Sequence, residues 1–285
     1  MIAIRSFLRR LLARFLFVAC ALAGAAQAIA QEGEVLRLAV HPYASTLALI
    51  NTYRPLQSYL TTRLGRPVEF YTAPSYEGFI DTLFAGGYDI AISPPHFAVI
   101  ASEKYYVPIL HFQTRLEPLL IVRADSPLQK AEDFRGKRVA MADRTAFIRL
   151  VTVKWLADHG LQSGTDYQIV ERPNHGASIS AAAMGEVDAG LGTLTALRQL
   201  PPDLQQQVRA IGTGLRFPHL FTLVHRRLGD AEIARIKQAL LAFQDTAEGR
   251  QFMEKSSYKG FEEISPDELR SLAPYVELFR RLEAR

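Results

Sequence analysis

The stretch that decides the fold covers residues 71–98, YTAPSYEGFIDTLFAGGYDIAISPPHFA. Residues 68–72 predict a short strand, and Ser75 can accept the first backbone N–H groups of a following helix. The inward residues of that helix recur at helical spacing, as Phe79, Ile80, Leu83 and Phe84. Two glycines then end the helix, and the apolar residues 88–92 predict a second, buried strand. Strand, helix and strand in this order form the unit of a parallel sheet with right-handed crossovers.

The segments that leave these two strands carry the polar side chains Tyr76, Ser93 and His96. In open parallel sheets, ligands bind beyond the carboxyl ends of the strands. We therefore expect a binding site at this edge of the sheet, with all three side chains as candidates. The alternative for Tyr76 and His96 is a packing role in the core.

Residues 1–30 have the composition of a secretory signal peptide. Four arginines precede and interrupt an apolar run that ends in small residues, and the run is too short for a membrane-spanning helix. Ala28 and Ala30 fit the A-x-A pattern before a cleavage site, so cleavage is expected after Ala30, with the site after Ala28 as the alternative. Lipid anchoring at Cys20 is not expected, because residues 17–19 make a poor lipobox. The sequence thus predicts export to the periplasm.

The charge balance of the exported chain excludes one class of partner. The whole sequence has 33 basic and 29 acidic residues, and the four arginines of the signal peptide leave the two counts equal. A neutral chain gives no reason to expect nucleic acid binding. Cys20 is the one cysteine, so the exported chain has no disulfide, thiolate ligand or cysteine nucleophile, as suits an oxidising compartment. We expect no cofactor.

The second half of the chain repeats the pattern of the first. In the first half we expect a strand at 35–40 and helices at 52–64 and after Ser75; in the second, helices at 145–159 and 177–184 and strands at 167–171 and 187–191. In both halves a helix ends at glycine and an aspartate opens the next strand, as the pairs Gly86 and Asp89, and Gly185 and Asp188. This repetition predicts two α/β lobes, each a mainly parallel sheet flanked by helices.

Several segments resemble the periplasmic phosphate, phosphite and phosphonate solute-binding proteins of ABC transporters. They are residues 53–92, the segment IVRADSPLQKAEDFRGKRVAMAD at 121–143, Asn174-His175 with SAAAMGEVDAG at 180–190, and FPHLFTLVHRRL at 217–228. The resemblance implies two lobes joined by two crossing strands, with a small ligand in the cleft between them. We expect residues 34–117 with 218–285 to form lobe one and residues 118–217 to form lobe two.

The sequence departs from this family at the oxyanion loop. The family has Ser-Thr-Ser-Gly at a helix start, where hydroxyls and N–H groups hold the oxyanion, whereas this chain has Arg144-Thr145-Ala146-Phe147. Arg144 could instead supply two parallel hydrogen bonds to a phosphonate-like oxyanion or a carboxylate, with a solvated loop arginine as the alternative. The residues predicted to bind this small anion are Tyr43, Tyr76, Ser93, His96, Arg144, Thr145, His175 and Thr193. Of these, Tyr76 and His175 align with positions that contact the ligand in the family.

The sequence leaves three alternatives to solute binding for an ABC permease to consider: a metal site, an enzyme and a ligand-sensing subunit. A metal site would have to use histidines near predicted strand ends, whose spacing fits no compact ligand motif: His41, His96, His175 and His219. An enzyme is not expected, because no catalytic constellation can be assembled from the sequence. A ligand-sensing subunit that docks on a membrane kinase or cyclase stays open, since both roles need the same ligand cleft. In either role we expect a monomer.

Overall fold

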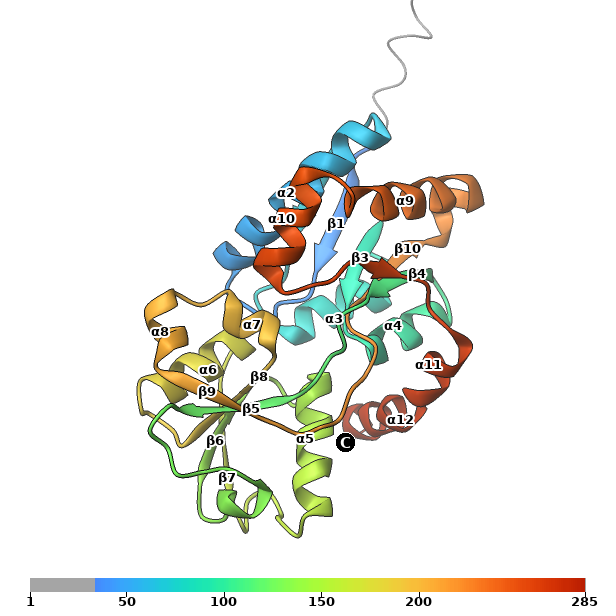
Figure 1. Ribbon diagram of the computed structural model, residues 1–285. Coiled ribbons are helices and arrows are strands. Elements are labelled where there is room, and N and C mark those ends of the chain that lie inside the picture. The colour runs from blue at the N-terminus through green and yellow to red at the C-terminus, as the bar shows by residue number, and fades with distance from the viewer. Residues whose placement is uncertain (1–33, 285) are drawn as a thin grey trace, which may run out of the picture.

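The computed structural model describes residues 34–284, in two lobes that each contain one sheet with helices on its faces (Figure 1). The predicted signal peptide, its cleavage site and Cys20 lie outside the described residues. Within residues 34–284 no helix is long and apolar enough to cross a bilayer.

The sheet of the first lobe has six strands in the order β11-β4-β10-β3-β1-β2. Its strands are β1 (Leu36–Val40), β2 (Val68–Tyr71), β3 (Ile90–Ser93), β4 (Tyr106–Phe112), β10 (Phe221–His225) and β11 (Phe261–Glu262). The helices of this part of the chain are α2 (Thr46–Leu64), α3 (Tyr76–Phe84), α4 (Pro95–Ser102), α9 (Gly229–Phe243), α10 (Ala247–Ser256), α11 (Pro266–Ser271) and α12 (Ala273–Glu283), with the 3-10 turn η2 (Arg226–Leu228). The predicted stretch 71–98 therefore supplies α3, β3 and the start of α4.

The sheet of the second lobe has five strands in the order β7-β6-β8-β5-β9. Its strands are β5 (Leu119–Arg123), β6 (Arg138–Met141), β7 (Gln168–Glu171), β8 (Ala189–Gly192) and β9 (Val208–Gly212). The helices are α5 (Phe147–Asp158), α6 (His175–Ala183), α7 (Leu194–Arg198) and α8 (Pro202–Gln206), with the 3-10 turn η1 (Ala131–Phe134). Both sheets are buried under helices, as the two-lobed α/β prediction requires.

Both sheets are mixed, whereas the sequence predicted mainly parallel ones. The pairs β1–β2, β1–β3, β6–β7 and β6–β8 are parallel, and the remaining pairs are antiparallel. The difference arises where the chain changes lobe. Because β4 leads out of the first lobe and β10 returns beside it, the two strands must run in opposite directions, and the same holds for β5 and β9.

Two extended segments, residues 113–118 and 213–220, connect the lobes and run side by side (Figure 1). They are paired at Leu116 and Phe217, whose backbones exchange two hydrogen bonds with N···O distances of 2.9 and 3.0 Å. Helix α12 packs against α4 of the first lobe and α5 of the second. The two crossing segments and α12 are thus the places where one lobe can bend relative to the other.

Helices α2, α5 and α6 differ from their predicted bounds, α6 because it covers His175–Ala183 instead of 177–184, and α4 was not predicted as a helix. Helix α2 begins at Thr46 instead of 52, because the Ser45 hydroxyl caps it, and it contains Pro55. Helix α4 follows β3 at once, since Pro95 occupies its first position, where proline's fixed φ favours a helix. Helix α5 begins at Phe147 instead of 145. His96 therefore lies in helix α4, and residues 145–146, predicted as the start of the helix next to the oxyanion, lie in a loop.

Candidate functional site

A small cavity of about 30 Å³ with buried lining residues lies where the two lobes meet. It is lined by residues of the first lobe, of the second lobe and of the crossing segments. They are His41, Tyr43, Tyr76, Pro94, Leu116, Phe147, Ile148, His175, Thr193, Thr195, His219, Leu220 and Tyr258. Because its walls come from both lobes, the cavity forms only when the two lobes are in contact.

Tyr76 and His175 meet across the lobes at one wall of this cavity. Each stands at the first position of its helix, α3 or α6, because the preceding Ser75 or Asn174 side chain caps that helix. The Tyr76 hydroxyl lies 3.1 Å from His175 Nε2, and both side chains are buried. Within the described part of the chain, His175 Nδ1 is buried and has no hydrogen-bond partner. A ring nitrogen in this state is suited to contact a ligand, since an unpaired buried polar atom costs free energy.

Tyr43 is held from the second lobe by two hydrogen bonds. Its carbonyl accepts the His175 backbone N–H at 3.2 Å, and its hydroxyl accepts from Gln199 Nε2 at 2.7 Å. The phenolic proton of Tyr43 therefore stays available to other acceptors. Thr193 is in a similar state: its hydroxyl oxygen caps α7 by accepting the Ala196 N–H, which leaves the hydroxyl proton to donate.

The first residues of α5 form part of the cavity wall. Phe147 and Ile148, the first two residues of this helix, both line the cavity. Among the described residues, neither backbone N–H has a hydrogen-bond partner, as expected for the first turn of a helix without a side-chain cap. Two free N–H groups and the positive end of the helix dipole favour an anion at this point.

The loop before α5 is fixed by Asp143 and His96. The Asp143 carboxylate accepts both the Thr145 backbone N–H and its hydroxyl, at 2.8 and 2.6 Å, so the hydroxyl proton of Thr145 is already donated. His96 Nε2 donates to the Thr145 carbonyl at 2.9 Å, from α4 across the lobe boundary. Neither Thr145 nor His96 lines the cavity. Both side chains position the start of α5 instead.

Two further predicted residues lie away from the cavity. Ser93 is fully buried at the end of β3, and its hydroxyl lies 3.4 Å from the Pro94 carbonyl. The placement of Arg144 differs most from the prediction: its exposed guanidinium lies 3.6 Å from the Glu283 carboxylate at the end of α12. It lines an outer surface groove beside α5 and α12. The structure thus brings together Tyr43, Tyr76, His175 and Thr193, but not Ser93, His96, Arg144 or Thr145.

The cavity holds no fixed charge, since none of its described lining residues is Arg, Lys, Asp or Glu. Burial lowers the pKa of His175 to about 4, and burial together with His111 lowers that of His219 to about 3. Burial and the neighbouring His175 lower the pKa of His41 well below its usual value. Burial also raises the pKa of Tyr76. The cavity therefore presents neutral hydrogen-bond donors and acceptors at neutral pH.

Comparison with known proteins identifies the family. Residues 38–269 match the family described as "ABC transporter, phosphonate, periplasmic substrate-binding protein". The chain belongs to this family. The resemblance expected from the sequence is thus confirmed, together with the two-lobed fold.

Individual members of the phosphonate-binding family differ widely from this chain in sequence. A protein of Mycolicibacterium smegmatis, named phosphate-import protein PhnD, is 27% identical over 199 residues, which cover 60% of this chain and 60% of that protein. The match therefore spans less than two thirds of that relative's length. These family members are substrate-binding proteins, and the enzyme alternative gains no support from them.

Solved structures agree with the family fold. A binding protein component of an ABC phosphonate transporter from Pseudomonas aeruginosa has a TM-score of 0.75 at 17% identity, with 87% of both chains covered. The protein PhnD1 from Prochlorococcus marinus, in complex with methylphosphonate, has a TM-score of 0.75 at 13% identity, with 86% of this chain and 98% of that chain covered. At such identities the likeness concerns the fold.

Sequence reasoning missed several cavity residues. His41 and His219 were noted only as possible metal ligands, and Tyr258 was not singled out. His219 precedes β10 and accepts the Leu220 N–H at Nδ1, at 2.8 Å, so its ring proton is on Nε2. Tyr258 follows α10 and stacks on Phe112 at 3.7 Å between ring centroids. For His219, its place just before the predicted strand 221–225 was the one signal in the sequence.

Proposed function

We propose that the cavity between the lobes binds a small oxyanion, phosphonate-like or phosphate-like or a small carboxylate, for delivery to an ABC permease. The observation that carries this proposal is the N-terminus of α5: Phe147 and Ile148 line the cavity, and their backbone N–H groups have no hydrogen-bond partner within the described residues. Desolvated backbone donors of this kind hold an anion without a positively charged side chain.

Four side chains are assigned to the ligand. The hydroxyl protons of Tyr43 and Thr193 are free to donate, because their oxygens already accept other hydrogen bonds. Tyr76 and His175 share one hydrogen bond. A ligand that accepts the Tyr76 hydroxyl proton therefore also changes the hydrogen bond of the His175 ring. We assign His41, His219 and Tyr258 to the same wall of donors and acceptors.

The remaining predicted residues receive other roles in this proposal. His96 and Thr145 position the first turn of α5, and Ser93 anchors the end of β3. Arg144 is assigned to the contact between the α5 loop and α12. The anion is therefore held by backbone and neutral side-chain donors instead of by a guanidinium.

The bounds of the lobes, the oligomeric state and the export route are further parts of this proposal. We propose that the chain divides into residues 34–117 with 218–285 and residues 118–217, and that it works as a monomer. We further propose that a cleaved signal peptide at residues 1–30 exports the protein. The name of the Mycolicibacterium smegmatis relative supports phosphate among the oxyanions to test.

A thermal-shift screen followed by calorimetry tests the ligand class. The panel contains phosphate, phosphite, phosphonates, sulfonates and small carboxylates at constant ionic strength, with uncharged analogues as controls. The protein is unfolded and refolded beforehand to remove any anion carried through purification. A ligand at about 100 times its dissociation constant stabilises the fold by about 2.7 kcal/mol, which is readily measured. A melting point raised only by neutral or cationic compounds would contradict the proposal.

A further inference from the structure

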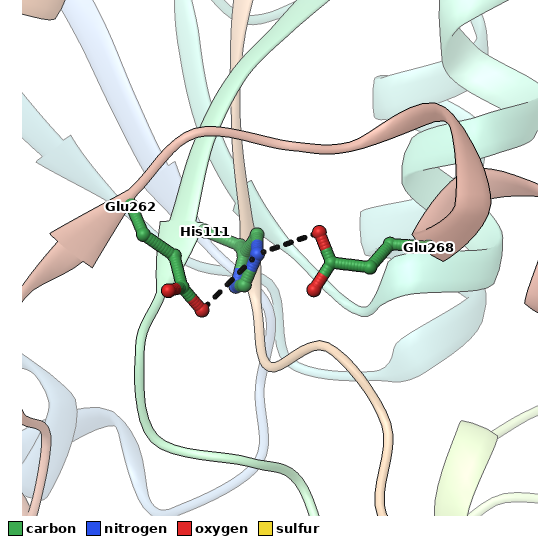
Figure 2. Close-up of side chains that lie close together, drawn as sticks. All are labelled: His111, Glu262 and Glu268. Atoms are coloured by element: carbon green, nitrogen blue, oxygen red, sulfur yellow. Dashed lines mark hydrogen bonds and ion pairs between the residues drawn. The ribbon is translucent and has the colours of Figure 1, made fainter.

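A second cluster of polar side chains lies outside the ligand cavity, on three elements of the first lobe. Figure 2 shows His111 of β4 between Glu262 of β11 and Glu268 of α11. His111 Nε2 lies 3.3 Å from Glu268 Oε2 and 3.5 Å from Glu262 Oε1. One nitrogen and two carboxylate oxygens thus converge within 4.8 Å of one another, the one such group among residues 34–284.

The hydrogen bond at the other ring nitrogen fixes the state of His111. Nδ1 lies 2.8 Å from the Phe112 carbonyl, which can only accept, so Nδ1 carries a proton. In the neutral ring, Nε2 then directs its lone pair at the two carboxylates. Metal-binding histidines almost always have this arrangement, with the second ring nitrogen donating to a carbonyl or carboxylate. Either a second proton or a cation must stand between Nε2 and the two oxygens.

The separations favour a metal ion over a proton. Charge-assisted N–H···O bonds are about 2.7–2.9 Å long, and neither separation from His111 Nε2 is that short. In a tetrahedral zinc site with bonds of about 2.0–2.1 Å, neighbouring ligand atoms are about 3.3–3.4 Å apart. The two observed separations lie close to that value. Glu262 Oε1 is also buried without a hydrogen-bond partner in the described part of the chain, as a ligand atom aimed at a metal would be.

Neighbouring side chains orient the two carboxylates. Arg115 donates to Glu268 Oε1 at 2.5 Å, on the side away from His111, and Ser265 donates to Glu268 Oε2 from its N–H and its hydroxyl. Arg115 also lies 3.8 Å from Glu262 and offsets part of the negative charge. These contacts orient the ligand atoms in the way that outer-shell groups do in metal sites.

We propose that His111 Nε2, Glu262 Oε1 and Glu268 Oε2 bind one zinc ion. Imidazole nitrogen with carboxylate oxygens is a ligand set that suits Zn²⁺, and three protein ligands leave the fourth position to water. The Glu262 side chain is 35% exposed, which gives the ion a path from solvent. The ion would tie the C-terminal elements β11 and α11 to β4, independently of any anion in the cavity.

Calorimetric titration of the untagged, chelator-treated protein with zinc chloride tests the site. One ion is expected per chain, and X-ray absorption is expected to give nitrogen and oxygen ligands at about 2.0–2.1 Å. Glu262→Gln should weaken zinc binding at least tenfold. The matched control is Glu263→Gln, which alters the adjacent, exposed carboxylate that pairs with Lys237 and should leave zinc affinity unchanged.

Two results would overturn the site. One is a wild-type protein that binds no zinc stoichiometrically. The other is Glu262→Gln and wild type binding zinc equally, with the variant differing only in stability, which would make the cluster a set of ion pairs. Because Glu262 lies at the end of a two-residue strand and is partly exposed, its isosteric change leaves the fold intact for this comparison.

Discussion

The Tyr76 hydroxyl and His175 Nε2 lie 3.1 Å apart and join α3 of one lobe to α6 of the other. The same boundary is crossed by the His96 bond to the Thr145 carbonyl and by the His175 N–H bond to Tyr43. With the bond from Gln199 Nε2 to the Tyr43 hydroxyl, four inter-lobe hydrogen bonds therefore lie around one cavity. Tyr43, Tyr76 and His175, which make three of these bonds, also line the cavity.

Removal of the Tyr76 hydroxyl should weaken anion binding. Tyr76→Phe keeps the buried ring and deletes one donor, and a hydrogen bond to a charged group contributes about 1.5–3 kcal/mol. We expect the dissociation constant of the best anion, measured by calorimetry, to rise at least tenfold. The matched control is Tyr71→Phe, because Tyr71 is exposed and bonds only to the nearby Glu69. Equal affinities of the two variants would remove Tyr76 from the site.

The buried histidines predict a loss of stability in mild acid. The pKa is lowered to about 4 in folded His175 and to about 3 in folded His219, against about 6.5 in the unfolded chain. Below about pH 6.5 the unfolded state binds more protons, so the free energy of unfolding falls as pH drops toward 4. The slope is at most about 1.4 kcal/mol per pH unit for each histidine.

Urea unfolding at pH 7.5, 6.5 and 5.5 measures this slope. His175→Gln should reduce it relative to wild type, because one buried titrating group is gone. His159→Gln is the control, since His159 is exposed at the end of α5. A wild-type stability that stays constant from pH 7.5 to 5.5 would show that these histidines do not oppose protonation in the folded state.

Much of the fold could be predicted because its signals are local. The repeated glycine and aspartate mark the same contact in both lobes. Asp89 Oδ2 accepts the Arg37 N–H at 2.8 Å between β3 and β1, and Asp188 Oδ2 accepts the Arg138 N–H at 2.8 Å between β8 and β6. Each aspartate fixes the register of two parallel strands. A short sequence pattern therefore identified the duplicated lobe, while the antiparallel pairs depend on how the chain crosses between lobes.

The candidate site was only partly predictable because its other determinants are distant in sequence. Arg144 was expected at the ligand because it precedes a helix. Its guanidinium instead pairs with Glu283 of α12 at the surface, and nothing in the sequence near residue 144 indicates that contact. His96 was expected in a loop, yet Pro95 starts a helix there without a polar cap. His41, His219 and Tyr258 reach the cavity only through the packing of both lobes.

Two glycines should respond in opposite ways to alanine. A Cβ on Gly190 would lie 2.0 Å from the Ser178 carbonyl oxygen, where β8 meets the backbone of α6. Gly190→Ala should lower the free energy of unfolding by at least about 2 kcal/mol, because neither backbone can move freely. In Gly78→Ala, inside α3, the new Cβ has its nearest neighbour at 3.4 Å. That change should raise stability by up to about 1 kcal/mol. Denaturant unfolding of both variants tests the packing; equal effects would contradict it.

Arg144→Ala should leave anion affinity within about twofold of wild type. The guanidinium is exposed and paired with Glu283, and an exposed ion pair contributes about 0–1 kcal/mol to stability. Calorimetry with the same anion used for Tyr76→Phe gives a direct comparison. A tenfold loss of affinity would mean that Arg144 turns toward the ligand in the bound state.

The cavity lies between the lobes and its lining residues are buried, so we expect the lobes to open when a ligand enters. The bonds of His96 to Thr145 and of Tyr76 to His175 must then separate, while the crossing segments 113–118 and 213–220 bend. Because a ligand in the cavity contacts both lobes only when they are together, we expect it to shift the population toward the closed form described here. Small-angle scattering should give a smaller radius of gyration at saturating anion, and His96→Ala should open the ligand-free protein further. A radius that is unchanged by saturating ligand would exclude closure as part of binding.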